Sequence, residues 1–486
     1  MSTPTSQSSA QPSAPPSTQP SAQSQIPESA ASSQLVSINP ATGQLIQQHL
    51  VLNEHAIERT IARAQGAYDC WRQLSYSARG EILKKVAKSL RSNKQQLGQL
   101  MTDEMGKPVK EAGPEVEKAA WCAEHYAEFT EAYLADEPIA SDASHSYVHY
   151  QPLGPVLGIM PWNSPLWVTF RFLAPALMAG NTCVLKHDPH VQGCAQGIIQ
   201  AFIDAGAPSD IVVNLPIENS QIEAVIRHPS IQAISFTGSA RAGAIVAAQA
   251  ASEIKPCVLE LGGSDPCVIL ADADIDQATD IVTLSRTINA GQSCIAAKRV
   301  IVEAPIYSAV VERLKAKLGQ LVVGDPNQLE TDIGPLARDD LRQTLHRQVQ
   351  QTIHQGARCL LGGEMPSGDG FYYPVTLLVD VPAQSCAMVE ETFGPVMVVS
   401  CVEDAAQALS LANDTEYGLG AAIWTQSEEK ARYFAEQLIA GQVAVNGIVK
   451  TDPRLPSGGV KRSGYGRELG PHGIKEFVNA KQIWLK

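Results

Sequence analysis

Three polar side chains in the sequence are of the types that nucleophilic and acid–base chemistry requires. Cys294 follows a polar, Gly-containing turn at 289–293, where backbone N–H groups can surround a thiol and favour its thiolate form. Glu260 lies between two leucines and before a Gly-Gly pair that would let it move, and burial there raises a carboxyl pKa toward the range of a general base. Asn163, on a proline-bounded turn, has an amide that can donate to a developing oxyanion.

Each of these residues also has an ordinary structural interpretation. A free cysteine is commonly a small buried side chain, and a glutamate among apolar residues often forms a structural ion pair. An asparagine beside a proline often closes an Asx-turn. Taken alone, none of the three decides between the two interpretations, but Cys294 and Glu260 together favour catalysis.

The stretch 235–243 is typical of phosphate binding. Gly238 and Ser239 form a turn between an apolar strand and an alanine-rich helix, so backbone N–H groups and the helix dipole point toward a pyrophosphate. The spacing from Gly238 to Gly243 differs from the usual GxGxxG fingerprint, so this motif is weak when taken alone.

Composition excludes several classes of protein. The chain has 486 residues, of which 44% are hydrophobic, and its charge of 37 − 50 = −13 argues against nucleic-acid and membrane partners. The ten cysteines show no CxxC pair and no metal-ligand spacing, so we expect no metal site and a reducing, cytoplasmic location. Residues 1–34, rich in Ser, Pro and Gln, resemble neither a signal peptide nor a membrane anchor and are predicted to be a disordered tail.

The pattern of apolar residues predicts an α/β protein with two domains. Helical patterns cover 53–75, 77–95 and 114–135, and short apolar strands then alternate with helices on what should be a parallel sheet. A second alternating block follows Gly263. Its strands are expected near 267–270, 299–303, 376–380, 396–402, 420–424 and 442–445. The segment 146–153 could pair with the C-terminal residues as an exposed arm.

The order Asn163, 236–243, Glu260 and Cys294, with 294 − 260 = 34 residues between base and nucleophile, closely resembles the aldehyde dehydrogenase superfamily. Two further stretches match the superfamily, and the similarity covers roughly residues 35–486. These stretches are the EETFGPV segment at 390–396 and the C-terminal PSGGVKRSGYGREL at 456–469.

The resemblance implies a Rossmann-like cofactor domain, an α/β catalytic domain and a small β-arm for oligomerisation. On this basis the NAD(P)-binding domain comprises 35–138 and 153–259, and the catalytic domain comprises 260–456. The arm comprises 139–152 and 474–486, and the protein is expected to be a homodimer or homotetramer.

The resemblance also implies a mechanism. Cys294 attacks the aldehyde to form a thiohemiacetal and then a thioester, while Asn163 and the Cys294 backbone N–H hold the oxyanion. Glu260 activates the water that releases the free carboxylic acid. Relatives that transfer the acyl group to coenzyme A or phosphate usually lack this glutamate, so hydrolysis is expected.

For the cofactor, the resemblance places Lys186 at the adenosine ribose. NAD-specific relatives usually have a glutamate three positions later, where this chain has Pro189. Without that carboxylate NADP is favoured and NAD remains possible, since Asp188 retains some negative charge nearby. The other residues that match cofactor contacts are Trp162, Gly238, Ser239, Gly243, Glu391 and Phe393.

For the substrate, the chain resembles the bacterial, short-form succinate-semialdehyde dehydrogenase branch. Arg171 would bind the far carboxylate of the substrate, Thr451 would offer it a hydroxyl, and Trp167 would form a wall of the pocket. The expected reaction is oxidation of succinic semialdehyde to succinate.

Other interpretations remain open at this stage. Arg171 can instead form a structural salt bridge, and Ile288 stands where long-form enzymes have a second arginine, which favours a broad-specificity enzyme for neutral aldehydes. Ala296 replaces the second cysteine of redox-regulated members, so no vicinal disulfide can form there. A non-catalytic dinucleotide-binding structural protein is the alternative of another class, against which the intact catalytic triplet counts.

Replacing Pro189 by glutamate tests the cofactor preference. A carboxylate beside the adenosine ribose would repel the 2′-phosphate, so Pro189→Glu is expected to lower kcat/KM for NADP at least tenfold more than for NAD. Steady-state kinetics with both cofactors measure the ratio. An unchanged ratio would contradict the assignment of this position.

Overall fold

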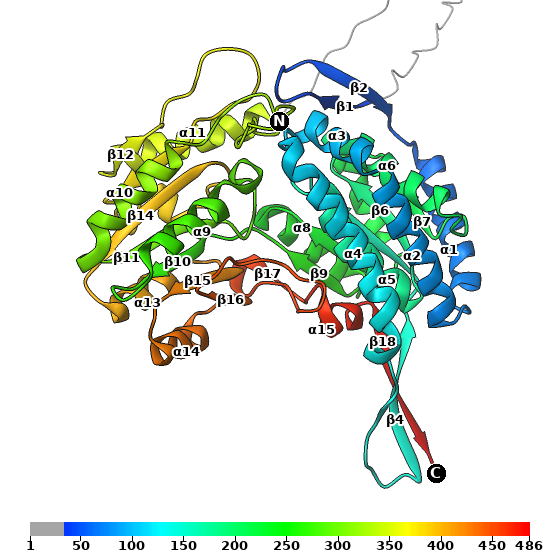
Figure 1. Ribbon diagram of the computed structural model, residues 1–486. Coiled ribbons are helices and arrows are strands. Elements are labelled where there is room, and N and C mark those ends of the chain that lie inside the picture. The colour runs from blue at the N-terminus through cyan, green and yellow to red at the C-terminus, as the bar shows by residue number, and fades with distance from the viewer. Residues whose placement is uncertain (1–33) are drawn as a thin grey trace, which may run out of the picture. The chain divides into compact units, whose positions relative to one another are not determined.

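Four β-sheets organise residues 34–486, the part of the chain that the computed structural model describes (Figure 1). The Ser/Pro/Gln-rich segment predicted to be disordered lies outside the described residues, except for its last residue, Gln34, which begins β1. Strands β1 (Gln34–Ile38) and β2 (Leu45–Leu50) pair as an antiparallel hairpin. Across the described residues no helix is both long and apolar enough to cross a membrane.

The first large sheet has six strands in the order β17-β9-β8-β5-β6-β7. All neighbours are parallel except β17, which is antiparallel to β9. Strands β5 and β6 are buried along their whole length, as expected for central strands of a parallel sheet that is covered on both faces. The strands are β5 (Pro155–Met160), β6 (Thr182–His187), β7 (Val212–Asn214), β8 (Ala233–Thr237), β9 (Cys257–Glu260) and β17 (Gly464–Tyr465). The helices between them are α5 (Pro165–Ala179), α6 (Gln192–Asp204), α7 (Ile222–Arg227) and α8 (Ala240–Ser252).

Four helices precede this sheet, one more than the sequence predicts. They are α1 (Glu54–Trp71), α2 (Tyr76–Ser92), α3 (Lys94–Met105) and α4 (Val109–Tyr133). Helix α3 was not expected. Asn93 both ends α2 and precedes α3, so the pattern of apolar residues shows no break between the two helices. Helix α4 begins before the expected Pro114, because the Glu111 N–H donates to the Pro108 carbonyl (2.8 Å) and starts the helix there.

The second large sheet has seven strands in the order β12-β13-β14-β11-β10-β15-β16. Its neighbours are parallel except for β12, and all six strands expected in this block are confirmed. The strands are β10 (Asp265–Ile269), β11 (Ala297–Glu303), β12 (Arg358–Leu361), β13 (Thr376–Val379), β14 (Val396–Val402), β15 (Gly420–Trp424) and β16 (Gln442–Val445). The helices are α9 (Ile275–Thr287), α10 (Tyr307–Leu318), α11 (Asp339–His354), α12 (Cys386–Val389), α13 (Ala405–Asn413) and α14 (Glu428–Gln437).

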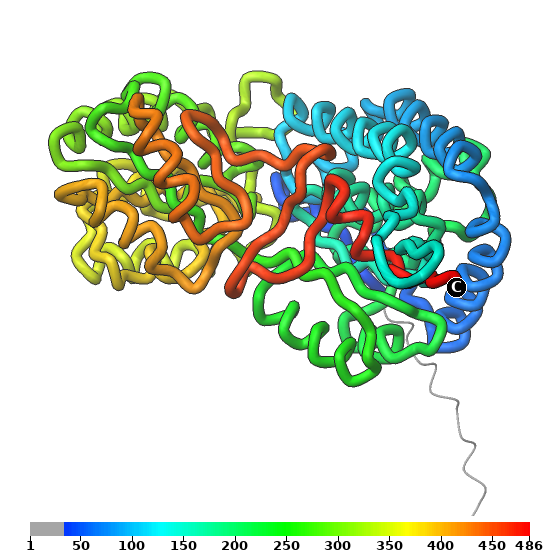
Figure 2. The backbone as a smooth tube through the Cα atoms, turned by 90° about the horizontal axis from the view of Figure 1, so that it is seen from below, coloured from blue at the N-terminus to red at the C-terminus, as the bar shows by residue number. Residues whose placement is uncertain are grey.

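The chain after β16 leaves the second sheet and returns to the first, where β17 pairs with β9 and places Gly464 opposite Glu260. Figure 2 shows this C-terminal segment running between the helices of the two sheets. After α15 (Gly470–Lys475), β18 (Val478–Leu485) pairs along its whole length with β4 (His145–Pro152), which confirms the predicted arm pairing. With β3 (Glu137–Pro138) they form a three-stranded sheet that extends away from the large sheets (Figure 1).

Candidate active site

A cavity of about 630 Å³ lies where the first sheet meets the loop that carries Cys294. Nine of the predicted site residues line it: Trp162, Asn163, Arg171, Lys186, Gly238, Ser239, Cys294, Glu391 and Phe393. Five others are not among its lining residues: Glu260, Pro189, Gly243, Trp167 and Thr451. Within residues 34–486, no group of three or more His, Cys, Asp and Glu side chains could hold a metal ion.

The loop before Cys294 has an unusual backbone. Three successive residues of the 3-10 helix η3 (Ile288–Gly291) have left-handed φ angles: Asn289 (57°), Ala290 (54°) and Gly291 (73°). Such angles are strained for residues with a side chain and persist only where surrounding contacts impose them. At Gly291 a Cβ would also lie 2.4 Å from the Gly394 carbonyl oxygen, so only glycine fits.

Buried hydrogen bonds impose this conformation. The Asn289 amide donates to the Asn163 carbonyl at 2.7 Å, and the Arg286 guanidinium donates to the carbonyls of Gly291 (3.1 Å) and Thr392 (2.9 Å). Asn163 in turn donates from Nδ2 to the Gln292 carbonyl at 3.0 Å. An amide nitrogen carries two hydrogens, so Asn163 retains one that it can donate to a ligand.

The Cys294 thiol is half-buried and close to two positive charges. Burial raises the pKa of Cys294 to about 11, although Arg171 and Lys298 act in the opposite direction. At neutral pH the resting group is therefore a thiol. The two cations stabilise negative charge that develops on the sulfur, which favours the thiolate once a substrate is bound.

Lys298 is a site residue that the sequence analysis missed. It is fully buried on β11, and its ammonium donates to the carbonyls of Ser293 (2.8 Å) and Cys294 (2.6 Å). It also lies 3.4 Å from Glu391 Oε1, which accepts a hydrogen bond from the Gly263 N–H at 3.0 Å. Lys298 thus ties the backbone of the nucleophile to a residue predicted to contact the cofactor. The available sequence signal was the Lys298-Arg299 pair at the start of an apolar stretch, shortly after Cys294.

Glu260, at the end of β9, shares a buried ion cluster with Arg171 and Glu468. Arg171 Nη2 lies 3.4 Å from Glu260 Oε2, and the same guanidinium contacts Glu468 closely. Glu260 Oε1 is buried and has no hydrogen-bond partner among the described residues. Burial and the neighbouring Glu468 raise the pKa of Glu260 to about 8. The sequence had marked the motif that contains Glu468 without assigning the residue a role.

Trp167 and Thr451, predicted to contact the substrate, are in contact with each other. Trp167 Nε1 donates to Thr451 Oγ1 at 3.0 Å, and both side chains are buried. Trp167 and Arg171 are one turn apart on α5, so their side chains lie on the same side of that helix. Lys118, which the sequence analysis did not select, donates to the same hydroxyl at 3.0 Å.

The other end of the cavity has the features of a dinucleotide site. Ser239 caps α8 by accepting a hydrogen bond from the Ala242 N–H at 3.3 Å, so the helix begins at the cavity. Gly243 allows this helix to approach Leu261, where a Cβ would lie at 2.5 Å. Thr237 Oγ1, which lines the cavity, is buried without a partner in residues 34–486. Trp162 and Phe393 meet edge to face, with their ring centres 5.7 Å apart.

Lys186 and Asp188, at this end of the cavity, each have a polar partner within the protein. Lys186 Nζ donates to Asn219 at 2.7 Å, and burial lowers the pKa of this lysine. Asp188 lines the cavity, but it accepts hydrogen bonds from the backbone N–H (3.0 Å) and the ring Nδ1 (2.9 Å) of His190. Two arginines, Arg241 and Arg338, also line the cavity. The residues present therefore fit a nicotinamide dinucleotide, including one with an additional phosphate.

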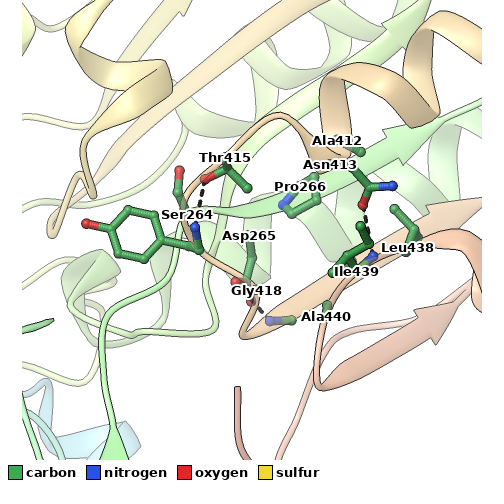
Figure 3. A pocket seen from close by; sticks show the side chains of 13 residues that line it. Ser264, Asp265, Pro266, Ala412, Asn413, Thr415, Gly418, Leu438, Ile439 and Ala440 are labelled. Atoms are coloured by element: carbon green, nitrogen blue, oxygen red, sulfur yellow. Dashed lines mark hydrogen bonds between the residues drawn. The ribbon is translucent and has the colours of Figure 1, made fainter. Parts of the chain in front are cut away.

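A second cavity, bordered by Ser264 and Asp265 at the start of β10, is too small for such a ligand (Figure 3). Its volume of about 10 Å³ accommodates one water molecule at most. Asp265 accepts a hydrogen bond from the Gly420 N–H at 3.0 Å, and burial raises the pKa of this carboxyl to about 7. The cavity that Cys294 and Asn163 line is therefore the candidate active site.

Comparison with known proteins assigns the family. A family profile described as the aldehyde dehydrogenase family matches residues 27–483. A relative from Synechocystis sp., named as a probable NADP(+) succinate-semialdehyde dehydrogenase, is 46% identical over 93% of this chain and 99% of its own. The NAD(P)+ succinate semialdehyde dehydrogenase Sad of Escherichia coli is 44% identical over 93% of this chain and 98% of its own.

A solved structure agrees with these relatives. The crystal structure of succinic semialdehyde dehydrogenase from Streptococcus pyogenes in complex with NADP+ has a TM-score of 0.91 and 32% identity, over 93% of this chain and 99% of that chain. The chain therefore belongs to the aldehyde dehydrogenase family. The resemblance and the α/β fold class predicted from the sequence are confirmed.

The contact between Lys298 and the nucleophile can be tested by alkylation. Below a pKa of about 11 the thiolate fraction rises tenfold per pH unit, so alkylation of Cys294 by iodoacetamide is expected to accelerate from pH 7 to pH 9 without a plateau. Lys298→Met removes a positive charge and is expected to slow alkylation about tenfold at pH 8. Peptide mass spectrometry follows the reaction, with the exposed Cys70 and Cys401 as internal references. A plateau near pH 8, or an unchanged rate in the variant, would contradict this account.

Proposed function

We propose that the protein oxidises succinic semialdehyde to succinate and reduces NADP or NAD. The observation that carries the proposal is that Cys294 and Asn163 line the same cavity as the features of the dinucleotide site. The names of the two relatives at 46% and 44% identity support the particular aldehyde. Arg171 lines this cavity near Cys294, and Glu260 and Glu468 already contact its guanidinium.

In this proposal, Cys294 attacks the aldehyde carbon as a thiolate and forms a thiohemiacetal. The free amide hydrogen of Asn163 and the Cys294 backbone N–H donate to the oxygen that becomes negative. A bound nicotinamide dinucleotide supplies the hydride acceptor, so the carbon held on Cys294 ends as a thioester. Lys298 donates hydrogen bonds to the Ser293 and Cys294 carbonyls and acts as a positioning residue for the backbone of the nucleophile.

Glu260 is the proposed base for hydrolysis of the thioester. It takes a proton from water, whose oxygen then attacks the thioester carbon. The C–S bond breaks, the acid is released, and the proton held by Glu260 passes to the Cys294 sulfur. With its pKa raised to about 8, Glu260 is mostly protonated at pH 7 and gains its basic form as the pH rises through 8. In the present arrangement it contacts Arg171, and the Gly262-Gly263 pair that follows gives it room to turn toward Cys294.

NADP is the proposed preferred cofactor. Pro189 begins the 3-10 helix η1 (Pro189–Val191) and presents no carboxylate, and the charge of Asp188 is engaged by His190. Arg241 adds positive charge to the cavity wall, which suits the 2′-phosphate, whereas Arg338 is already paired with Asp340. Lys186, Gly238, Ser239, Gly243, Trp162, Glu391 and Phe393 are the other residues proposed to hold the cofactor.

The proposed domains correspond to the sheets of the structure. We propose that 35–138 and 153–259 bind the dinucleotide, that 260–456 carry the nucleophile, and that 139–152 with 474–486 form an oligomerisation arm. In the structure, β17 extends the first sheet from outside these ranges.

All ten cysteines are free, which supports a reducing compartment, and we propose the cytoplasm; detection of the protein in a secreted fraction would overturn this.

Two aldehydes of equal chain length test the proposed reaction. Wild-type protein is expected to convert succinic semialdehyde with at least tenfold higher kcat/KM than butanal, because only the former has a carboxylate. Cys294→Ser is expected to reduce kcat at least 10³-fold with both, since a serine hydroxyl without an adjacent base is a weak nucleophile. Production of NADPH or NADH measures both. Equal activity on the two aldehydes would instead indicate a broad-specificity enzyme for neutral aldehydes, which the existing carboxylate partners of Arg171 favour.

The arm can be tested by its solution mass. Strand β18 is one of the two edge strands of its sheet, and Trp484 (44% exposed) and Leu485 (48% exposed) present apolar surface. Wild-type protein is expected to have two or four times the chain mass of 52.0 kDa, and a double Trp484→Asp, Leu485→Asp variant is expected to be monomeric. Light scattering after size exclusion gives the mass, with the exposed Ile203→Asp as control. An unchanged mass in the double variant would exclude the arm.

A further inference from the structure

Glu111, in the first turn of α4, contacts the strained turn that precedes the nucleophile. Its Oε2 accepts a hydrogen bond from the Asn289 backbone N–H at 2.8 Å. Asn289 has a left-handed φ of 57°, and a residue with a side chain keeps such an angle only where surrounding contacts impose it. Glu111 therefore supplies one of the contacts that hold this backbone.

Asn289 is also in direct contact with Asn163. The Asn289 side-chain amide donates to the Asn163 carbonyl at 2.7 Å and to the Gln292 carbonyl at 3.2 Å. Asn163 Nδ2 donates to the same Gln292 carbonyl at 3.0 Å. One turn therefore holds both the Asn163 amide and the backbone that leads to Cys294, so a shift of this turn would move both.

Glu115, one helical turn after Glu111, binds the start of α5, which begins two residues after Asn163. Its Oε1 accepts hydrogen bonds from the backbone N–H groups of Leu166 (3.0 Å) and Trp167 (3.1 Å). Among the described residues, the N-cap residue of α5 offers no side-chain hydrogen bond to this end of the helix. Glu115 thus supplies an acceptor that the free N–H groups of a first helical turn require.

A buried lysine accompanies the two glutamates. Lys107, just before α4, contacts Glu115 closely, and both side chains are buried. Burial raises the pKa of Glu111, whereas Lys107 and the Asn289 N–H act in the opposite direction. Because residues four apart share a helix face, one face of α4 holds both the start of α5 and the turn before Cys294.

We propose that Glu111 is a positioning residue for the oxyanion site. Through the Asn289 N–H it holds the turn that leads to Cys294, so that the Asn163 amide and the backbone N–H of the nucleophile face one oxygen. This inference rests on the proposed attack of Cys294 on a carbonyl carbon, because that step forms the oxyanion. Glu111 is not among the residues that line the cavity, and it acts through Asn289 rather than on the substrate.

Two reagents that react with Cys294 separate the oxyanion site from the sulfur itself. With 4-nitrophenyl acetate, the thiolate attacks the ester carbon through a tetrahedral oxyanion, the C–O bond breaks, and 4-nitrophenolate leaves a thioester on the cysteine. Iodoacetamide alkylates the same sulfur by loss of iodide from a saturated carbon, and no oxyanion forms. Neither reagent needs an aldehyde or a dinucleotide, so the test is independent of the proposed substrate and cofactor.

Glu111→Ala removes the acceptor of the Asn289 N–H. It is expected to slow acylation of Cys294 about 10- to 100-fold, because misplaced donors lose much of their stabilisation of the oxyanion. Alkylation of Cys294 should stay within about threefold of the wild-type rate, since Arg171 and Lys298 still act on the sulfur. Absorbance of the released 4-nitrophenolate measures acylation, with Cys294→Ser as the background, and peptide mass spectrometry measures alkylation.

Two further substitutions at this position separate the hydrogen bond from the charge. Glu111→Gln keeps a carbonyl oxygen at the same reach without the charge and is expected to be acylated within about fivefold of the wild-type rate. Glu111→Asp keeps the charge but is one methylene shorter, so its acylation should be slowed as in Glu111→Ala. It provides a second reading if the alanine variant does not fold. Glu128→Ala, at an exposed glutamate of α4, should leave both rates unchanged.

The outcomes distinguish this proposal from the proposed function. If wild-type protein is acylated no faster than Cys294→Ser, the nucleophile is wrong and the oxyanion site is wrong with it. If wild-type protein is acylated and Glu111→Ala and Glu111→Asp keep its rate, the nucleophile stands and the role of Glu111 is overturned. Equal loss of acylation and alkylation, or a loss in Glu111→Gln that Glu111→Asp does not share, would overturn that role as well. Selective loss of acylation, restored in Glu111→Gln, supports it.

Discussion

A buried guanidinium joins three segments that are distant in the sequence. Arg171 of α5 contacts Glu468, from the C-terminal segment, and Glu260, at the end of β9. Two carboxylates facing one guanidinium in a buried cluster cannot both ionise easily, so burial and mutual repulsion raise the pKa of Glu260 to about 8. Loss of Arg171 or of Glu468 would leave an uncompensated buried charge, which is strongly unfavourable. The cluster therefore fixes α5 and the C-terminal segment against the first sheet.

Burial also determines the protonation states of the candidate active site. The burial that excludes water also raises the pKa of Cys294 to about 11, so the resting protein holds a thiol and a mostly protonated Glu260. Arg171 and Lys298 oppose the effect of burial at the sulfur. Positive charge is thus concentrated where negative charge must develop, which is how a water-poor site promotes nucleophilic chemistry.

Much of the fold could be predicted from the sequence because central strands of parallel sheets are continuous apolar runs. All six strands expected after Gly263 are present for this reason. The errors fall where the local pattern is ambiguous. Helix α3 follows α2 across Asn93 without a break in the pattern, and the exposed strand β2 has no apolar side that would mark it.

The sequence by itself determined the family and the positions of the strands after Gly263. It also identified Cys294, Glu260 and Asn163 as chemically capable groups. Tertiary structure alone decided which charges remain available. Arg171 lies against Glu260 and Glu468, and Lys298 lies 3.4 Å from Glu391. The physical reason is that the electrostatic interaction of a buried charge with a reacting group depends on the partners that folding places beside that charge, and these partners are distant along the chain.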